Sequence, residues 1–223
     1  MAQTTLDTSL LEGLPSNTTT FLRGDGTWAA AGGGQWTHVN TSATFWDGSA
    51  GIVTKEYTGL TSGKVYKFVF EDIELNTTSK AIHARFGYGS TTYDTSSGYY
   101  YAQRGEDSNN AGGDTSSTSA TAIPIAGGGH NMMGGTRNVT HAGVMYLEVI
   151  FRTGTGDHTQ AYPTIFYNGG TFTSSGYSMV HLGAGMNDAV VWDTNPTTAI
   201  KFYTSDESST FVDGRIIQYE LAN

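Results

Sequence analysis

Three carboxylates stand close together in the segment "FEDIEL" and could act as a general acid and a general base. Glycoside hydrolysis needs two carboxyl groups that flank the scissile bond and whose surroundings set their pKa values apart. Glu71 and Asp72 instead point to opposite faces of the strand that the surrounding alternation predicts, and Glu74 follows them. A solvent-exposed strand end explains all three residues. The sequence therefore predicts no enzyme and no catalytic residue.

The histidines and glycines offer no recognisable metal or cofactor motif. The six histidines show no metal-site spacing, and the absence of cysteine excludes a thiolate zinc site. The glycine clusters at 154–156 and 183–185 are not followed by the helical pattern that a phosphate-binding loop requires. We expect no cofactor and no metal. One alternative stays open, a site across a trimer axis with His130 or His141 as ligands.

A run of tyrosines gives the clearest binding chemistry. In "SSGYYYAQRG", a strand would point Tyr99 and Tyr101 to one face and Tyr100 to the other. Tyrosine combines an apolar ring with a hydroxyl, which suits both sugar stacking and protein interfaces. We group Tyr177, from a later segment rich in Gly and Ser, with these three as candidate glycan or partner contacts. The alternative is that they are edge and core aromatics of a β-sandwich.

Strands rather than helices must position these side chains. Hydrophobic residues make up 37% of the chain, while the 30 glycines and 13 tyrosines favour strands and turns. No window of 11 or more residues shows a 3.6-residue period. Period-2 alternation is found instead in five windows: 65–73, 81–88, 144–151, 200–203 and 215–221. The pattern predicts an all-β fold, an antiparallel, jelly-roll-like β-sandwich with very little helix.

The segments between these windows are rich in Gly, Ser and Thr and are predicted to be turns and loops. Two of them, 103–121 and 126–142, are long enough to form functional surfaces or contacts with a neighbouring chain.

Residues 1–35 differ from the rest and are predicted to form an extended N-terminal arm before a β-sandwich domain at 36–223. The arm ends in a run of small residues, Ala29 to Gly34, typical of a linker. Its tripeptide Arg23-Gly24-Asp25 is the integrin-binding signature, but Gly24 and Gly26 on either side of Asp25 favour a tight turn. Six arm residues are candidates for virion docking or trimer contacts: Leu10, Leu11, Leu14, Phe21, Leu22 and Trp28.

Charge and hydropathy exclude nucleic acid and the membrane as partners. The formal net charge is −9 and only 11 residues are Lys or Arg, so no basic stripe is available for nucleic acid. No segment approaches the roughly 18 apolar residues of a membrane span. The opening "MAQTTLDTSLLEGLPS" lacks the basic and apolar parts of a secretion signal, so we expect synthesis in a host cytoplasm.

The segment "LPSNTTTFLRGDGTWAAAG" resembles the connector that precedes a C-terminal β-domain in tailed-bacteriophage fibre and appendage proteins. Further along, "YTGL", "ARFGYGSTTYD" and the closing "GRIIQYEL" are similar to strand and turn motifs of that family. The resemblance covers roughly residues 14–104 and 196–221, and the middle diverges. It implies a jelly-roll-like sandwich, displayed as a homotrimer on a virion and often used to contact the host surface.

We therefore expect a virion structural protein, a trimeric fibre or spike tip on the virion surface. Its arm would dock onto other virion proteins, and its exposed loops at 90–142 and 168–190 would contact host glycan with avidity from three copies. Because only about 35 residues precede the β-domain, too few for a long shaft, the first alternative is a capsid decoration or head-fibre protein anchored by the arm. The second alternative is a glycan-degrading depolymerase, but the sequence shows no set of carboxylates of the kind that such an enzyme needs.

Overall fold

The fold is known for most of the chain. The computed structural model describes residues 20–22, 28–30, 36–41, 51–76, 80–89, 92–107, 113–126, 143–155, 162–172 and 178–222. Contacts divide the chain into two units, one of residues 36–221 and one of residues 1–35 with 222–223. Across the described ranges, the helical structure is a single 3₁₀ turn, η2 (Val190–Asp193), and no helix there has the length and apolarity needed to cross a membrane.

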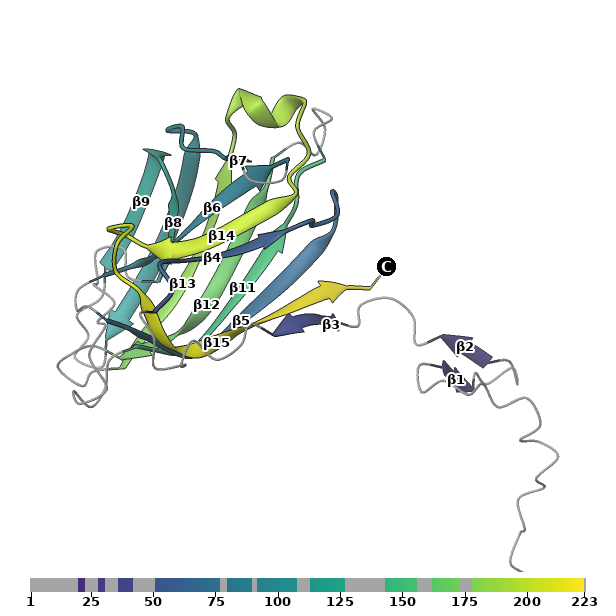
Figure 1. Ribbon diagram of the computed structural model, residues 1–223, viewed down its shortest axis with the longest axis horizontal. Coiled ribbons are helices and arrows are strands. Elements are labelled where there is room, and N and C mark those ends of the chain that lie inside the picture. The colour runs from purple at the N-terminus through teal and green to yellow at the C-terminus, as the bar shows by residue number, and fades with distance from the viewer. Residues whose placement is uncertain are drawn as a thin grey trace, which may run out of the picture. The chain divides into compact units, whose positions relative to one another are not determined.

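Eight antiparallel strands form the larger sheet, in the order β3-β15-β5-β11-β12-β13-β8-β9 (Figure 1). In chain order they are β3 (Trp36–Thr41), β5 (Val65–Leu75), β8 (Tyr99–Asp107), β9 (Gly113–Ala120), β11 (Gly143–Arg152), β12 (Thr164–Phe172), β13 (Ser178–Asn187) and β15 (Phe211–Leu221).

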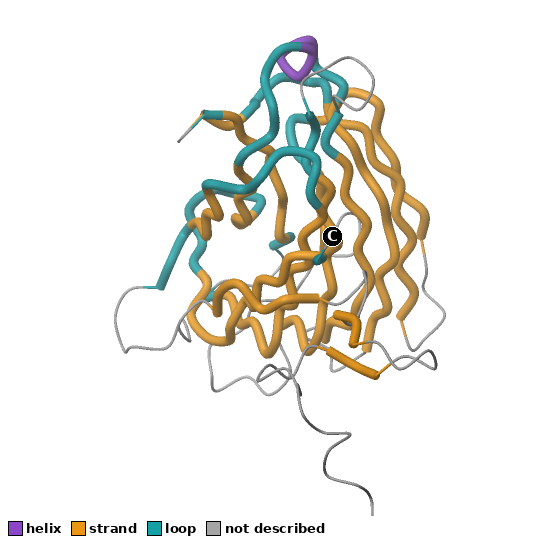
Figure 2. The backbone as a smooth tube through the Cα atoms, turned by 90° about the vertical axis from the view of Figure 1, so that its right-hand side faces the viewer, coloured by secondary structure: helices purple, strands orange, loops and turns teal. Residues whose placement is uncertain are grey.

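The smaller sheet has the order β10-β6-β14-β4, with the short β7 added to β6. Its strands are β4 (Thr54–Thr58), β6 (Ile82–Tyr88), β7 (Thr92–Tyr93), β10 (Ile123–Ala126) and β14 (Ala199–Thr204). The two sheets pack face to face, as the turned view shows (Figure 2). The chain passes repeatedly from one sheet to the other, from β3 to β4, β5 and β6 in turn. The predicted all-β, jelly-roll-like sandwich is confirmed.

Alternating apolar side chains fill the space between the sheets. Tyr66, Phe68 and Phe70 on β5 are all buried, as the period-2 pattern predicts, and so are the inward residues of β6. Phe202 on β14 lies at the centre, with its ring centroid 4.9 Å from that of Phe70 and 5.2 Å from that of Phe68. The hydrophobic effect of this burial is the main force that holds the two layers together.

A β-bulge changes the phase of β5 after Phe70. Asp72 has a φ of +52° and Gly214, on the neighbouring β15, a φ of +94°, and the pairing register shifts on either side of Asp213. Beyond the bulge the inward residues are odd-numbered, beginning with Ile73. The predicted strand window, 65–73, is therefore too short, since β5 continues to Leu75, and the carboxylate cluster lies near the end of this strand. A bulge bends and twists a strand without ending it.

The prediction of a long loop over residues 103–121 is also wrong. Most of this segment is a hairpin in which β8 pairs with the edge strand β9 along a register from Tyr99↔Ala120 to Gly105↔Gly113. The sequence of β9, "GDTSSTSA", has no apolar alternation, and none of its residues is fully buried. The segment 126–142 lies outside the described residues except for Ala126, the last residue of β10.

The unit that contains the predicted arm includes two short strands, β1 (Thr20–Leu22) and β2 (Trp28–Ala30), which pair antiparallel with Leu22 opposite Trp28. Residues 23–27, where a tight turn is predicted, lie outside the described residues. So do Leu10, Leu11 and Leu14.

Candidate functional site

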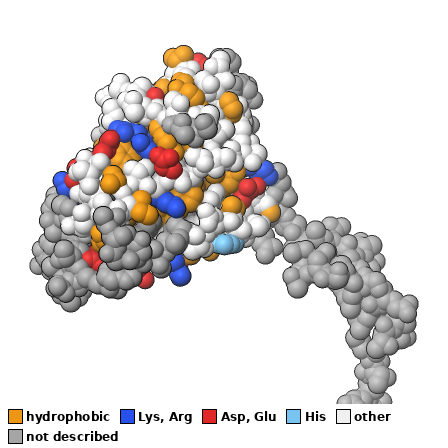
Figure 3. Space-filling model, in the orientation of Figure 1, with side chains coloured by type: hydrophobic (Ala, Val, Ile, Leu, Met, Phe, Trp, Pro, Cys, Tyr) orange, Lys and Arg blue, Asp and Glu red, His pale blue; other side chains and the backbone are white. Residues whose placement is uncertain are grey.

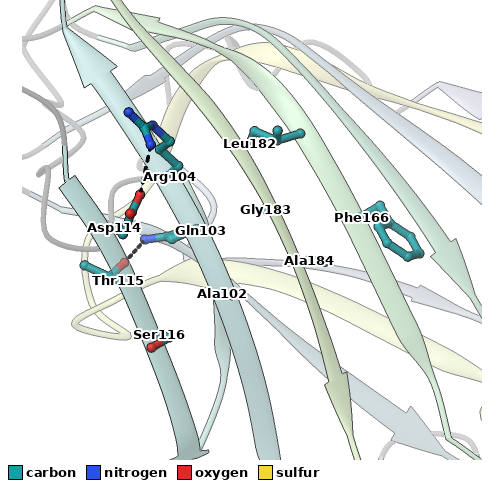
Figure 4. Close-up of a pocket in the computed structure, with 10 residues that line it drawn as sticks. All are labelled: Ala102, Gln103, Arg104, Asp114, Thr115, Ser116, Phe166, Leu182, Gly183 and Ala184. Carbon is teal, nitrogen blue, oxygen red and sulfur yellow. Dashed lines mark hydrogen bonds and ion pairs between the residues drawn. The ribbon is translucent and has the colours of Figure 1, made fainter. Parts of the chain in front are cut away.

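The outer face of the larger sheet carries a shallow groove over β8, β9, β12 and β13 (Figure 4). It consists of two adjoining hollows of about 640 and 400 Å³. Both hollows are lined by the same four residues at their junction: Ala102, Ser116, Phe166 and Ala184. The groove is thus one continuous surface feature built by four neighbouring strands.

Strand register explains why the face is hollow here. Phe166, Ala184, Ala102 and Ser116 lie opposite one another across four successive strands. The last three have small side chains and form a floor, and the whole row of four spans roughly 14 Å across three inter-strand steps of about 4.8 Å. Longer side chains flank the floor two residues away on each strand: Leu182, Arg104 and Asp114 on one side, Met186 and Tyr100 on the other.

Two exposed apolar side chains dominate one end of the groove. Phe166 is 58% exposed and Leu182 is 63% exposed, and they lie near each other on neighbouring strands (Figure 4). Val180, two residues before Leu182 on the same face, is also exposed. Apolar groups that gather on a soluble surface typically mark a site of contact with a ligand or a protein.

Charged and polar groups form the other end. Arg104 donates a hydrogen bond through Nε to Glu106 Oε1 at 2.9 Å, and its Nη1 lies 3.9 Å from Asp114 Oδ1. Glu106, which has the larger effect, and Asp114 both raise the pKa of the Arg104 guanidinium. Ser116 presents a hydroxyl beside them. The arrangement sets hydrogen-bonding groups next to an apolar surface, the combination found in small-ligand sites.

The floor is supported from the inner side by a hydrogen-bonded chain. The Tyr167 hydroxyl donates to Gln103 Oε1 at 2.9 Å, and Gln103 Nε2 donates to Thr115 Oγ1 at 2.8 Å. The Tyr167 ring lies directly under Gly183, where a Cβ atom would come within 2.3 Å of it. Only glycine leaves room for this ring, so the groove rests on a closely packed support.

The predicted tyrosine run is only partly at this site. Tyr100 lines the groove on the outer face, and the predicted alternation is confirmed. Tyr99 is fully buried: its hydroxyl accepts from the Phe86 amide and donates to the Asp94 carbonyl, and burial raises its pKa. Tyr101 is half-buried and packs against the core. Tyr177 lies outside the described residues.

Sequence reasoning missed Phe166, Leu182, Arg104 and Asp114. A signal did exist for the first two, because β12 and β13 carry apolar residues on both faces, whereas a strand with one solvated face should alternate. Phe166 lies between the buried Ile165 and Tyr167. An apolar residue in the outward position of such a strand can therefore be read as a contact residue.

The outer face of the smaller sheet carries a second polar cluster, but its charges are compensated. Figure 3 shows basic and acidic side chains close together over this sheet. The Arg85 guanidinium bonds to Glu207 Oε1 at 2.7 Å and to the Thr121 carbonyl at 2.9 Å. Lys201 lies over the rings of Tyr93 and Tyr203, at 4.8 and 5.2 Å from their centroids. Cation–π contacts and ion pairs of this kind stabilise the sheet surface.

His83, in the same cluster, should make the fold sensitive to acid. Burial first, and then the charge of Arg85, lower the pKa of His83 to about 4, while Glu207 opposes the shift. The unfolded chain therefore binds this proton more readily, so the contribution of neutral His83 to stability is present above about pH 6.5 and is lost as the pH falls toward 4. We expect a loss of about 3 kcal/mol across this window.

Urea unfolding at pH 7.5, 6, 5 and 4.2 measures this loss, and His83→Gln should flatten the profile. The difference between the two proteins at pH 7.5 gives the packing cost of the substitution alone. Parallel profiles for both proteins would show that another group causes the acid sensitivity.

Among the described residues, no group of three or more His, Asp and Glu side chains is placed to hold a metal ion. His130 and His141 lie outside those residues. The chain matches no protein-family model, and neither the curated proteins nor the solved structures include a significant match to it. The groove geometry and the connector motif are therefore the basis for assigning a function.

Proposed function

We propose that this protein is a structural component of a tailed-phage virion, and that its β-sandwich recognises a host-surface glycan through the groove. The observation that carries the proposal is the exposed pair Phe166 and Leu182 beside Arg104, Asp114 and Ser116. The apolar face of a sugar ring stacks on an aromatic side chain, and sugar hydroxyls bond to carboxylate, guanidinium and hydroxyl groups. No catalytic step is part of the proposal.

The connector "FLRGDGTW" supports the virion part of the proposal. Strands β1 and β2 lie at the two ends of this segment and pair with each other in antiparallel orientation. In the proposed assembly the arm docks onto another virion protein, and the chain forms a homotrimer. Three weak sites on one particle then bind a repetitive surface far more strongly than one.

A specific observation also favours the second candidate, a capsid decoration protein. The apolar character of the outer face extends beyond the groove to Val180 and to Tyr146, which is 44% exposed. Such a surface suits a protein partner as well as a sugar. A depolymerase has less support, because Glu71 bonds to Arg215 and the groove carboxylates Glu106 and Asp114 both face Arg104.

Truncating the apolar end of the groove should abolish most glycan binding. We expect Phe166→Ala and Leu182→Ser each to weaken binding of the purified protein to intact host cells by about tenfold, since each removes a contact of about 1.4 kcal/mol. Flow cytometry with a fluorescently labelled protein measures the change.

Val190→Ser is the matched control for these variants. Val190 is 80% exposed, belongs to η2 and lines neither hollow of the groove, so its replacement should leave binding unchanged. Full binding by both groove variants would contradict the proposed site.

Antibody labelling of virions separates the two candidate functions: label at the tail tip supports the fibre, and label on the head supports the decoration protein.

A further inference from the structure

We propose that the ligand of this groove is an uncharged saccharide and that the surroundings of the groove reject acidic ones. This inference rests on the proposed glycan-binding function and deepens it, since it names the chemical class of the sugar. It is carried by the identity and placement of the charged groups around the groove.

Carboxylates outnumber guanidinium groups at this site. Asp114 lines the groove, and Glu106 follows Arg104 by two residues on the same face of β8. Asp188 lies at the far wall, where it hydrogen-bonds to the Tyr100 hydroxyl and raises the pKa of Tyr100. Glu148 is diagonal to Phe166 on the neighbouring strand, because Asn168 faces Glu148 and Phe166 faces Ile150.

The guanidinium groups near the groove are already engaged. Arg104 bonds to Glu106 and lies beside Asp114, so its charge is balanced within the protein. Arg152, which faces Thr164 at the Phe166 end, also has an interaction of its own. A carboxylated or phosphorylated sugar that bonded to Arg104 would lie beside the carboxylates of Glu106 and Asp114, which would repel it.

An uncharged sugar uses the same groups without this conflict. Its hydroxyls can donate to Asp114 and accept from Arg104 while the ion pair stays intact. Its apolar ring face can lie on Phe166 and Leu182, which carry no charge. The formal net charge of −9 acts in the same direction, because a negative protein slows the approach of a polyanionic polysaccharide.

The test is an array of bacterial surface polysaccharides and oligosaccharides that covers neutral and acidic classes, probed with the full chain. We expect the bound glycans to be uncharged. For affinity we compare galacturonate tetrasaccharide with its methyl ester, which removes the charges and retains the sugar rings. The free acid should bind at least about tenfold more weakly at low salt, and the difference should shrink at about 0.5 M salt because the repulsion is screened.

A charge variant tests the cause of the discrimination. Glu106→Gln combined with Asp114→Asn should narrow the difference between acid and ester, whereas Glu56→Gln, on the smaller sheet, should leave it unchanged. Equal or tighter binding of acidic glycans that is lost in Phe166→Ala would overturn the inference and retain the groove. Equal binding of the acid and the ester that is lost in Arg152→Gln would also overturn the inference and retain the groove. An array without any bound glycan would overturn both the inference and the proposed function.

Discussion

Gly214→Ala is expected to lower the free energy of unfolding by about 3 kcal/mol or more, a large share of the stability of a domain of this size. Gly214 has a φ of +94°, which residues with a Cβ atom rarely adopt. An added Cβ would also lie 2.6 Å from the carbonyl oxygens of Glu71 and Asp72. Since both atoms belong to the backbone of a central strand, they cannot rotate away, and the bulge between β5 and β15 must distort.

Gly59→Ala separates the two causes. Gly59 also has a positive φ, +71°, but no atom lies within 4 Å of the position of an added Cβ. Its replacement should therefore cost only the backbone strain, about 1 kcal/mol. Urea unfolding of both variants at pH 7.5 measures the difference. Losses of equal size would mean that the close approach to Glu71 and Asp72 contributes nothing.

Phe202→Ala should have a similarly large effect, through the core rather than the backbone. Phe202 is fully buried, and its ring lies within 6.0 Å, centroid to centroid, of the rings of Tyr57, Phe68 and Phe70. Its truncation leaves a cavity where the two sheets meet. We expect a loss of about 3–5 kcal/mol, and a fall in Tm of roughly 10 °C or more. Thermal and urea unfolding both measure it.

Phe166→Ala is the matched control, because the same change is made on the outer face of the larger sheet instead of in the core. Phe166 is 58% exposed, so its removal should change stability by no more than about 0.5 kcal/mol while it weakens glycan binding. Two results would contradict the assignment of core and site: a stable Phe202→Ala protein, or a Phe166→Ala protein that unfolds as readily as Phe202→Ala.

The core strands could be predicted from sequence because one of their faces is buried. In β5, Tyr66, Phe68 and Phe70 alternate with more exposed residues, and this local pattern alone identifies both the strand and its inward face. The bulge at Asp72 was not predicted, since it depends on Gly214, about 140 positions later in the chain. A single strand does not show where its partner interrupts the ladder.

Neither the edge strand β9 nor the groove could be predicted from local sequence, because both depend on how several strands pair. Strand β9 consists of Gly, Asp, Ser and Thr with a single Ala at its end, so its sequence resembles that of a loop. The groove floor needs the register of four strands, which places Phe166 and Ala184 in one row with Ala102 and Ser116. Of the candidate residues chosen from sequence, Tyr100 and Tyr101 both border the smaller hollow, and strand alternation alone was enough to predict that Tyr100 points outward.

The row that forms the groove floor has a consequence for how such a protein changes over generations. Ala102, Ser116, Phe166 and Ala184 all line the groove, while Ile165 and Tyr167, on either side of Phe166, lie in the core. A point mutation at one of these four positions can alter the shape of the binding surface without disturbing the packing behind it. Under the proposed function, ligand preference and foldability are therefore set by different residues of the same strands, and a lineage can shift its target by single substitutions while the sandwich stays intact.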